Sequence, residues 1–334
     1  MAKLPALPEA VANNAIAKVT VNDETYLLTF MGLGAEKTYK DVHNKAWALR
    51  VGDNAWREIA PVPSSLTLKG RLASIAVGIG ELTYIFGGYT VAKDHTEISS
   101  PDNFVYSVVD NEYTAIANTP VPVDDAIALV YQNRFIYLIS GWHNDGNVNL
   151  TQVYDIKTNT WQQASPYYGE PTFGHAGGIV GNKMLVCDGV AVKPRRNARR
   201  TFAAKTQCFS GTIDQQNPYK IDWRIVEHPT GESRYRMAAV GRARSAEIIF
   251  IGGSNNPYNY NGIGYNGEPA TPDNRIWIFN TKSAKWHLKV STTGTMDHRG
   301  LIELGDRFYT IGGMVNKQTV IADLISYDYA DFFK

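Results

Sequence analysis

The chain has 334 residues, of which 33 are Lys or Arg and 32 are Asp or Glu, so its formal net charge is +1. Hydrophobic residues make up 44% of it, which is enough for a large core and excludes a disordered chain. The near-zero net charge argues against a general binder of nucleic acids or membrane surfaces, because phosphate-rich partners require an excess of Lys and Arg.

The N-terminal sequence MAKLPALPEAV carries Pro5, Pro8 and Glu9 where a signal peptide needs an apolar run. Nothing approaches 18 consecutive apolar residues, so we expect no transmembrane helix and no membrane partner. As the sequence is written we expect a cytoplasmic protein, and a periplasmic one if a leader was removed from the natural chain. Cys187 and Cys208 are too few for a disulfide framework, and we expect them to be reduced.

Short apolar runs that end in small residues recur along the chain, at 25–32, 82–88, 134–141, 183–189, 247–253 and 307–313. Each run predicts a β-strand that is closed by a glycine turn. Another predicted strand precedes each run, as at 71–77, and two strands with central aromatic residues follow it, as at 153–161. The sequence therefore predicts six units of four strands each.

The glycine and aromatic pattern resembles the kelch repeat over nearly the whole chain. We predict an all-β fold, a six-bladed kelch β-propeller, in a single domain over residues 1–334. Aromatic side chains are expected between the blades, because a lone four-stranded sheet cannot bury both of its faces. Segment 2–19 resembles 115–130, so we expect the N-terminal segment to supply or extend the outer strand of the last blade and close the ring. Segment 328–333 is the alternative.

Propeller geometry assigns the loops to faces. Because the strands of a blade alternate in direction, the connections between units lie on the same face as the loops between second and third strands. Aligning the units on their first strands gives six comparable inner positions: Asn14, Arg71, Asp125, His175, Arg236 and Arg299. Asp124 and His298 lie beside two of these positions. The loops of the same face add Tyr89, Trp142, His143 and Asn255.

This set of residues predicts a pocket for a small anionic sugar or a related metabolite. Guanidinium groups match carboxylates, so Arg71, Arg236 and Arg299 are the expected clamp. The other expected ligand contacts are Trp142 and Tyr89 as an apolar wall, with His143 and Asn255. The candidate acid–base catalysts are Asp124, Asp125, His175 and His298. The alternative is that the arginines pair with Asp124, Asp125 or carbonyl oxygens and only plug the channel.

Other features give weaker signals. The basic segment 193–200 lacks interleaved aromatic residues, so we expect a solvated loop or a lid and no nucleic-acid site. We expect no metal and no cofactor, because the histidine spacing fits no zinc site. One alternative is a metal-dependent enzyme in which His143, His175 and His298 meet through the fold. A second is a propeller that binds a protein or a glycan without catalysis, since propellers serve unrelated functions.

The opening LPALPEAV at 4–11 and the GLG at 32–34 resemble bacterial N-acetylneuraminate epimerases, which are sialic acid mutarotases. The resemblance implies a propeller that interconverts the anomers of a carboxylated sugar, with arginine holding the carboxylate and an acidic residue moving the proton. It also implies a periplasmic protein. The catalytic glutamate of that family is expected in the long loop of the fourth unit, here 190–207, which has no acidic residue. Asp188 and Glu232 are the candidates to replace it.

Overall fold

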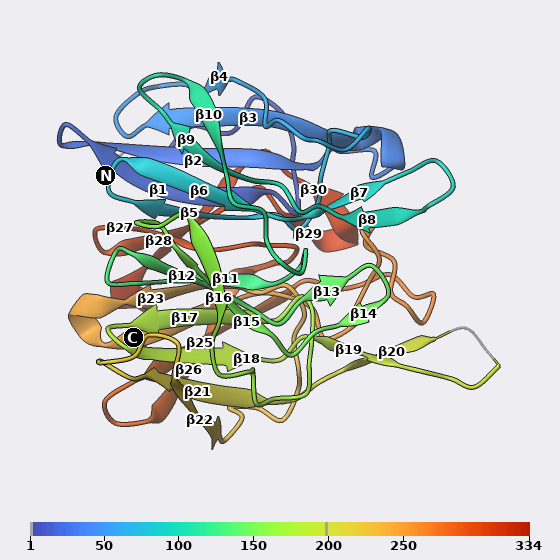
Figure 1. Ribbon diagram of the computed structural model, residues 1–334, viewed down its shortest axis with the longest axis vertical. Coiled ribbons are helices and arrows are strands. Elements are labelled where there is room, and N and C mark those ends of the chain that lie inside the picture. Colours follow the sequence, from blue (N-terminus) through green and yellow to red (C-terminus); the bar gives the residue numbers. More distant parts are fainter. Residues whose placement is uncertain (1–2, 198–199) are drawn as a thin grey trace.

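The computed structural model describes residues 3–197 and 200–334. Within them, six antiparallel sheets form the blades (Figure 1). Blade one contains β1 (Ala15–Val21), β2 (Glu24–Leu33), β3 (Val42–Arg50) and β4 (Arg57–Ile59). Blade two contains β5 (Ile75–Ile79), β6 (Leu82–Phe86), β9 (Asn103–Ser107) and β10 (Glu112–Ile116). Blade three contains β11 (Ile127–Tyr131), β12 (Phe135–Ile139), β15 (Thr151–Asp155) and β16 (Thr160–Gln163).

Blade four contains β17 (Ala176–Val180), β18 (Lys183–Cys187), β21 (Cys208–Ile213) and β22 (Ile221–Val226). Blade five contains β23 (Ala238–Arg242), β24 (Glu247–Ile251), β25 (Asp273–Asn280) and β26 (Lys285–Thr295). Blade six contains β27 (Ile302–Leu304), β28 (Arg307–Ile311) and β31 (Leu324–Asp328). The short 3-10 helices are η1 (Tyr39–Asp41), η2 (Ala243–Ser245), η3 (Asn316–Gln318) and η4 (Tyr329–Phe333). The first strand of every blade contacts the first strands of its two neighbours, β27 and β1 included, so the ring is closed. The predicted six-bladed propeller is confirmed.

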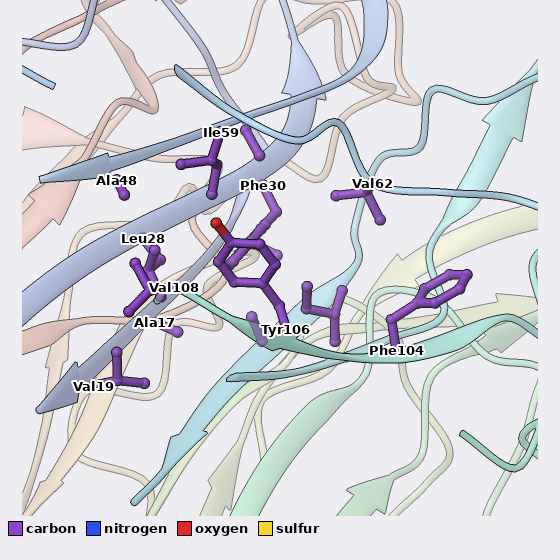
Figure 2. Close-up of a cluster of buried hydrophobic side chains, with 14 of the residues drawn as sticks. Ala17, Val19, Leu28, Phe30, Ala48, Ile59, Val62, Phe104, Tyr106 and Val108 are labelled. Carbon is purple, nitrogen blue, oxygen red and sulfur yellow. The ribbon is translucent and has the colours of Figure 1, made fainter. Parts of the chain in front are cut away.

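Apolar side chains fill the wedge between each pair of neighbouring blades. Figure 2 shows the wedge between blades one and two, where Phe30 and Tyr106 meet edge to face with ring centroids 5.7 Å apart. Corresponding clusters lie between the other blades, and one joins blade six to blade one. The blades therefore bury one another's faces as predicted, and this packing holds the inner strands around a common axis.

The N-terminal segment closes the ring without forming a regular strand. The Leu7 amide donates to the Ala322 carbonyl over 2.8 Å, and the Val11 amide donates to the Ile321 carbonyl over 3.2 Å, just before β31. Leu7 and Val11 also join the cluster between blades six and one. Helix η4 covers the other side of blade six, where Phe332 stacks on Phe308 at 5.7 Å. Both predicted closing segments therefore cover the last blade, but neither supplies a paired fourth strand in the described part of the chain.

Small hairpins extend the loops between second and third strands, and they project on one side of the propeller (Figure 1). They pair β7 (Tyr89–Val91) with β8 (Glu97–Ser99), β13 (Trp142–His143) with β14 (Gly146–Asn147), β19 (Val190–Lys193) with β20 (Thr201–Ala204), and β29 (Met314–Val315) with β30 (Thr319–Val320). We call this side the loop face and the opposite side the turn face. Among the described residues, no helix is long and apolar enough to cross a membrane.

The prediction of reduced cysteines is wrong. Cys187 on β18 and Cys208 on β21 are register partners on neighbouring strands and form a disulfide, with Cα atoms 4.2 Å apart. The sequence did not reveal this pairing because the β19–β20 hairpin, which we call the arm, is inserted between the two cysteines. The disulfide therefore links the second and third strands of blade four at the base of the arm.

Candidate functional site

Residues with left-handed backbone conformation surround the axis just before the inner strands. We call them the axial ring: Asn13, Ala73, Asp125, Gly174, Arg236 and Asp297, whose φ values lie between 50° and 70°. The Gly174 amide donates to the Asp125 carbonyl over 2.8 Å, and the Arg236 amide donates to the Gly174 carbonyl over 2.8 Å. Similar bonds continue from blade to blade around the axis. The axial ring thus defines which inner positions are structurally equivalent.

The axial ring corrects the predicted alignment of inner positions. Arg71 lies two residues before Ala73 of the ring, so its equivalent in blade five is Arg234 and not Arg236. Arg71 is fully buried, and its guanidinium donates to the Gly87 carbonyl at 3.1 Å and the Pro63 carbonyl at 3.2 Å. The predicted convergence of three arginines is therefore wrong for Arg71. The alignment failed because it matched side-chain types, whereas the register is set by the residue that takes a positive φ.

The other two arginines meet at the axis in an ion cluster of Asp125, Arg236, Asp297 and Arg299. Arg236 donates to the Asp125 carboxylate from Nε at 3.1 Å and from Nη2 at 2.5 Å. It also donates from Nη1 to Asp297 at 2.9 Å. The Nη1 group of Arg299 donates to the same Asp125 carboxylate. These side chains are at most 2% exposed, so the cluster is sealed from the loop face.

Burial and charge shift the pKa values of the carboxyl groups in opposite directions. Burial raises the pKa of Asp297, and the nearby arginines offset this only in part. Burial works in the same direction at Asp125, but Arg236 and Arg299 outweigh it and leave its pKa below the ordinary value. Asp124 accepts a hydrogen bond from the Ser99 hydroxyl at 2.6 Å, and burial followed by repulsion from Asp125 raises its pKa well above the ordinary value. Asp125 is thus the most firmly ionised of the three.

An apolar cap covers the ion cluster on the loop face. It consists of Leu33, Leu72, Tyr89, Trp142, Phe173, Val190, Tyr235, Tyr258, Met296 and Met314. In each blade, an isolated β-bridge joins the residue before the axial ring to a residue at the end of the second strand or three positions beyond it, as between Tyr235 and Ser254. Tyr89 is 6% exposed and Trp142 is 8% exposed. The predicted apolar wall is therefore packed within the cap and does not line an open pocket on this face.

A cavity of about 390 Å³ runs along the axis beneath the ion cluster, and all of the inner strands line it. Its walls are mostly Ala, Val, Ile and Gly. Three polar residues line the end next to the cluster: His175, His298 and Arg299. Lys18 and Glu303 line the far end, where Lys18 is exposed and donates to the Glu303 carbonyl at 2.6 Å. The cavity therefore opens toward the turn face, opposite to the face that we predicted.

The cavity histidines are buried and neutral at physiological pH. Burial lowers the pKa of His175 to about 4 and that of His298 to about 3. His175 Nε2 lies 2.9 Å from the Ile139 carbonyl and so carries the proton, which leaves Nδ1 as an acceptor. His298 Nε2 lies 2.6 Å from the Thr295 hydroxyl. His175 Nδ1 and Asp297 Oδ2 are buried without a hydrogen-bond partner among the described residues.

The remaining predicted residues lie away from the cavity. His143 is half-buried on β13 and its Nδ1 lies 2.6 Å from the Pro122 carbonyl, while Asn255 is exposed on the loop face. Asp188 is buried against His228 at 2.9 Å, and Glu232 pairs with Arg275 at 2.9 Å. The His143–His175–His298 metal site is not formed, and within residues 3–197 and 200–334 no group of three or more potential ligands is arranged to hold a metal.

The basic segment 193–200 lies at the tip of the arm, and positions 198 and 199 of it fall outside the described residues. Arg200 places its guanidinium 4.7 Å from the centroid of the Trp142 ring and donates to the Asp145 carbonyl at 2.8 Å. The exposed side chains of Lys193, Arg195 and Arg196 lie farther out. The described part of the segment is thus solvated, and Arg200 contacts the cap through Trp142. It corresponds to the solvated loop, one of the two predicted arrangements.

Sequence reasoning missed Asp297, which binds Arg236, and it missed Arg234, the true equivalent of Arg71. A usable signal was present. The ring positions Asn13, Asp125, Gly174 and Asp297 are of the residue types that most readily adopt a positive φ, and they recur at one point of the repeat.

No family model matches the chain. It is 21% identical over 263 residues to Kelch domain-containing protein 3 of Rattus norvegicus, a match that covers 73% of this chain and 64% of that protein. It is 26% identical over 139 residues to Kelch-like protein 15 of Gallus gallus, covering 41% of this chain and 27% of that protein. The chain thus spans less than two thirds of the length of these curated relatives.

A solved structure entitled "Structure of YjhT" has the same fold, with a TM-score of 0.74 and 16% sequence identity over 97% of this chain and 96% of that one. Together with the six sheets and the diglycine turns at 87–88, 252–253 and 312–313, these similarities show that the protein is a six-bladed β-propeller whose sequence is similar to kelch-domain proteins.

Proposed function

We propose that the protein binds a small anionic sugar, or a related carboxylated metabolite, at the inner end of the central cavity. The observation that carries this proposal is the position of Arg299, a residue that lines the cavity and whose guanidinium is anchored beside it by Asp125. Its Nε–H donates to the His298 carbonyl at 2.8 Å. A guanidinium has five N–H groups, so donors remain for a ligand, and the anchoring reduces the entropy lost when one binds.

The charge at this end depends on Asp297. Two guanidinium groups, Arg236 and Arg299, face Asp125, which is firmly ionised, and Asp297, whose pKa is raised by burial. The ion cluster is neutral when both carboxyl groups are ionised, and protonation of Asp297 would leave one positive charge for an anion. The cavity volume of about 390 Å³ falls in the range of roughly 300–1,000 Å³ that is usual for small-molecule sites.

Binding is tested by calorimetric titration with N-acetylneuraminate, and with the neutral sugar N-acetylmannosamine as the ligand control. We expect the carboxylated sugar to bind wild type and the neutral sugar to bind much more weakly. Ala128→Trp fills the cavity and should abolish binding, whereas Ile225→Trp, on the exposed side of blade four, should not. Equal affinity of the two tryptophan variants would mean that the sugar binds outside the cavity and would overturn the proposal. The absence of binding to wild type would also overturn it.

A sialic-acid-type mutarotase is the catalytic form of this proposal, and the resemblance to N-acetylneuraminate epimerases supports it. Ring opening requires one proton to be given and one to be taken at the anomeric centre. Among the candidate catalysts, His175 and His298 line the cavity, while Asp125 is occupied by its two arginines. Exchange of the anomers is followed by proton NMR. An unchanged rate at micromolar protein rejects the mutarotase and leaves a binding propeller.

A non-catalytic protein-binding propeller is the second candidate, supported by the kelch relatives and by the arm. The arm exposes Lys193, Arg195 and Arg196 beyond the cap, which suits an acidic partner. Charge reversal with Arg195→Glu and Arg196→Glu should release such a partner from the immobilised protein. The matched reversal Lys282→Glu, at an exposed turn of blade five, should retain it. A partner that is retained equally by both variants does not use the arm.

A further inference from the structure

Arg71 and Arg234 occupy the same position in blades two and five, two residues before the axial ring. Both are almost completely buried, at 0% and 1% exposed. The terminal nitrogens of Arg71 donate to three carbonyl oxygens and to the Ser100 hydroxyl at 3.2 Å, and only its Nε lacks a partner. In the described part of the chain, none of the three guanidinium nitrogens of Arg234 has a hydrogen-bond partner. The terminal nitrogens of the same side chain are therefore satisfied in one blade and unsatisfied in the other.

The surroundings of Arg234 contain a second unsatisfied donor. Its guanidinium lies 4.2 Å from the centroid of the Trp277 ring, and the indole Nε1 of Trp277 is also buried without a hydrogen-bond partner among the described residues. The Asp273 carboxylate approaches Nε of Arg234 to 3.3 Å without hydrogen-bond geometry. That carboxylate instead accepts from Arg275 at 2.7 Å. Its negative charge is thus shared, and Asp273 alone does not satisfy Arg234.

All of the unsatisfied groups are donors. Burial lowers the pKa of Arg234 to about 10, which still leaves the side chain charged at neutral pH. A buried charged donor without an acceptor is costly, so the chemistry of the site calls for an acceptor-rich occupant. Oxyanions offer several oxygen acceptors in the planar geometry that guanidinium groups recognise, whereas a water molecule must also place its own two hydrogens.

A hollow lies next to Trp277 at the outer surface of blade five. It has a volume of about 490 Å³ and is lined by Thr230, Arg275, Trp277, Leu288, Lys289 and Val290. Its lining carries cations and no carboxylate, and Trp277 contacts both the hollow and the buried guanidinium of Arg234. We propose that Arg234 and Trp277 form a binding site, separate from the central cavity, for a small oxyanion such as a phosphate or carboxylate group.

Inorganic phosphate is the probe, and the readout is thermal unfolding of the full chain against KCl at matched ionic strength. Phosphate should raise the Tm of wild type progressively, because a ligand that binds only the folded state stabilises it. Arg234→Met keeps the apolar stack on Trp277 and should lose the rise. Trp277→Phe keeps an aromatic ring but removes the indole N–H, and it should weaken the rise in Tm.

Arg71→Met, at the equivalent position of blade two, is the control and should retain the full rise. If Arg71→Met does not fold, Arg224→Met at an exposed site replaces it. A rise of equal size in wild type and Arg234→Met would indicate a general salt effect and overturn the proposal. Ordered water alone at Arg234 in a crystal structure obtained in phosphate would do the same.

Discussion

Asp125 of blade three and Arg236 of blade five, 111 residues apart in the sequence, join across the axis through two hydrogen bonds. Arg236 also binds Asp297 of blade six, so one guanidinium links three blades. These side chains are at most 2% exposed, so water compensates poorly for a lost partner. The pairing therefore holds the blades in register as well as placing Arg299 at the cavity.

Removing the guanidinium should destabilise the fold severely. Arg236→Met leaves Asp125 and Asp297 buried and short of a partner, and breaking a buried pair in this way costs about 3–5 kcal/mol of unfolding free energy. Urea denaturation measures the loss. The exposed pair of Arg224 and Asp222, 2.9 Å apart, provides the control, since Arg224→Met should cost less than about 1 kcal/mol. Similar losses in the two variants would contradict a structural role for the cluster.

The stability of the protein should depend on pH through His298. Its pKa is lowered to about 3 in the folded protein, below the ordinary value of 6.5. Between these values the unfolded chain binds more protons, so stability falls as the pH drops through this window, by up to about 1.4 kcal/mol per pH unit.

His298→Gln should flatten that slope between pH 6.5 and 4, which urea denaturation at several pH values measures. Comparison with wild type is needed because Asp124, with its raised pKa, contributes a slope of the opposite sign. Identical slopes in the variant and in wild type would mean that His298 does not titrate as its burial implies.

Loss of the disulfide should lower the free energy of unfolding. Replacing both Cys187 and Cys208 with serine removes a link between residues 21 positions apart, which is worth about 3 kcal/mol for a loop of that length. Denaturation with and without a thiol reductant checks this value. The reductant should destabilise wild type and leave the double variant unchanged. Free thiols in unfolded, unreduced wild type would show that the link does not form.

Close packing of the inner strands should make Gly241 sensitive to substitution. A Cβ atom at this position would collide with the Ile179 carbonyl of the neighbouring blade. Gly241→Ala should therefore lower the unfolding free energy by about 1–3 kcal/mol, as overpacking does. Gly146→Ala is the matched control, since a Cβ atom there meets nothing within 4 Å. Equal stability of the two variants would mean that the inner strands can move apart freely.

The repeat made the architecture predictable, because alternating apolar runs and glycine turns determine the strands locally. The grouping of loops on one face followed from strand direction alone. The inner register did not follow, because it depends on which residue adopts a positive φ, and Ala73 and Arg236 do so although their residue types do not favour it.

The sequence also did not predict which end of the central cavity is open. Tyr89 and Trp142 are aromatic residues in loops, and such residues are compatible either with an exposed wall or with a buried cap. Only the convergence of loops from all blades shows that they pack together. Cys187 and Cys208 likewise become partners only once β18 and β21 are known to pair around the arm.

The cap separates the hairpins of the loop face from the central cavity. The isolated β-bridges attach the hairpins to the segments before the axial ring, whereas the inner strands form the walls of the central cavity. Insertions at the tips of the hairpins can therefore accumulate, or be engineered, without reshaping the channel. A peptide epitope grafted into the arm would be displayed on the loop face, on the opposite side of the molecule from the mouth of the central cavity.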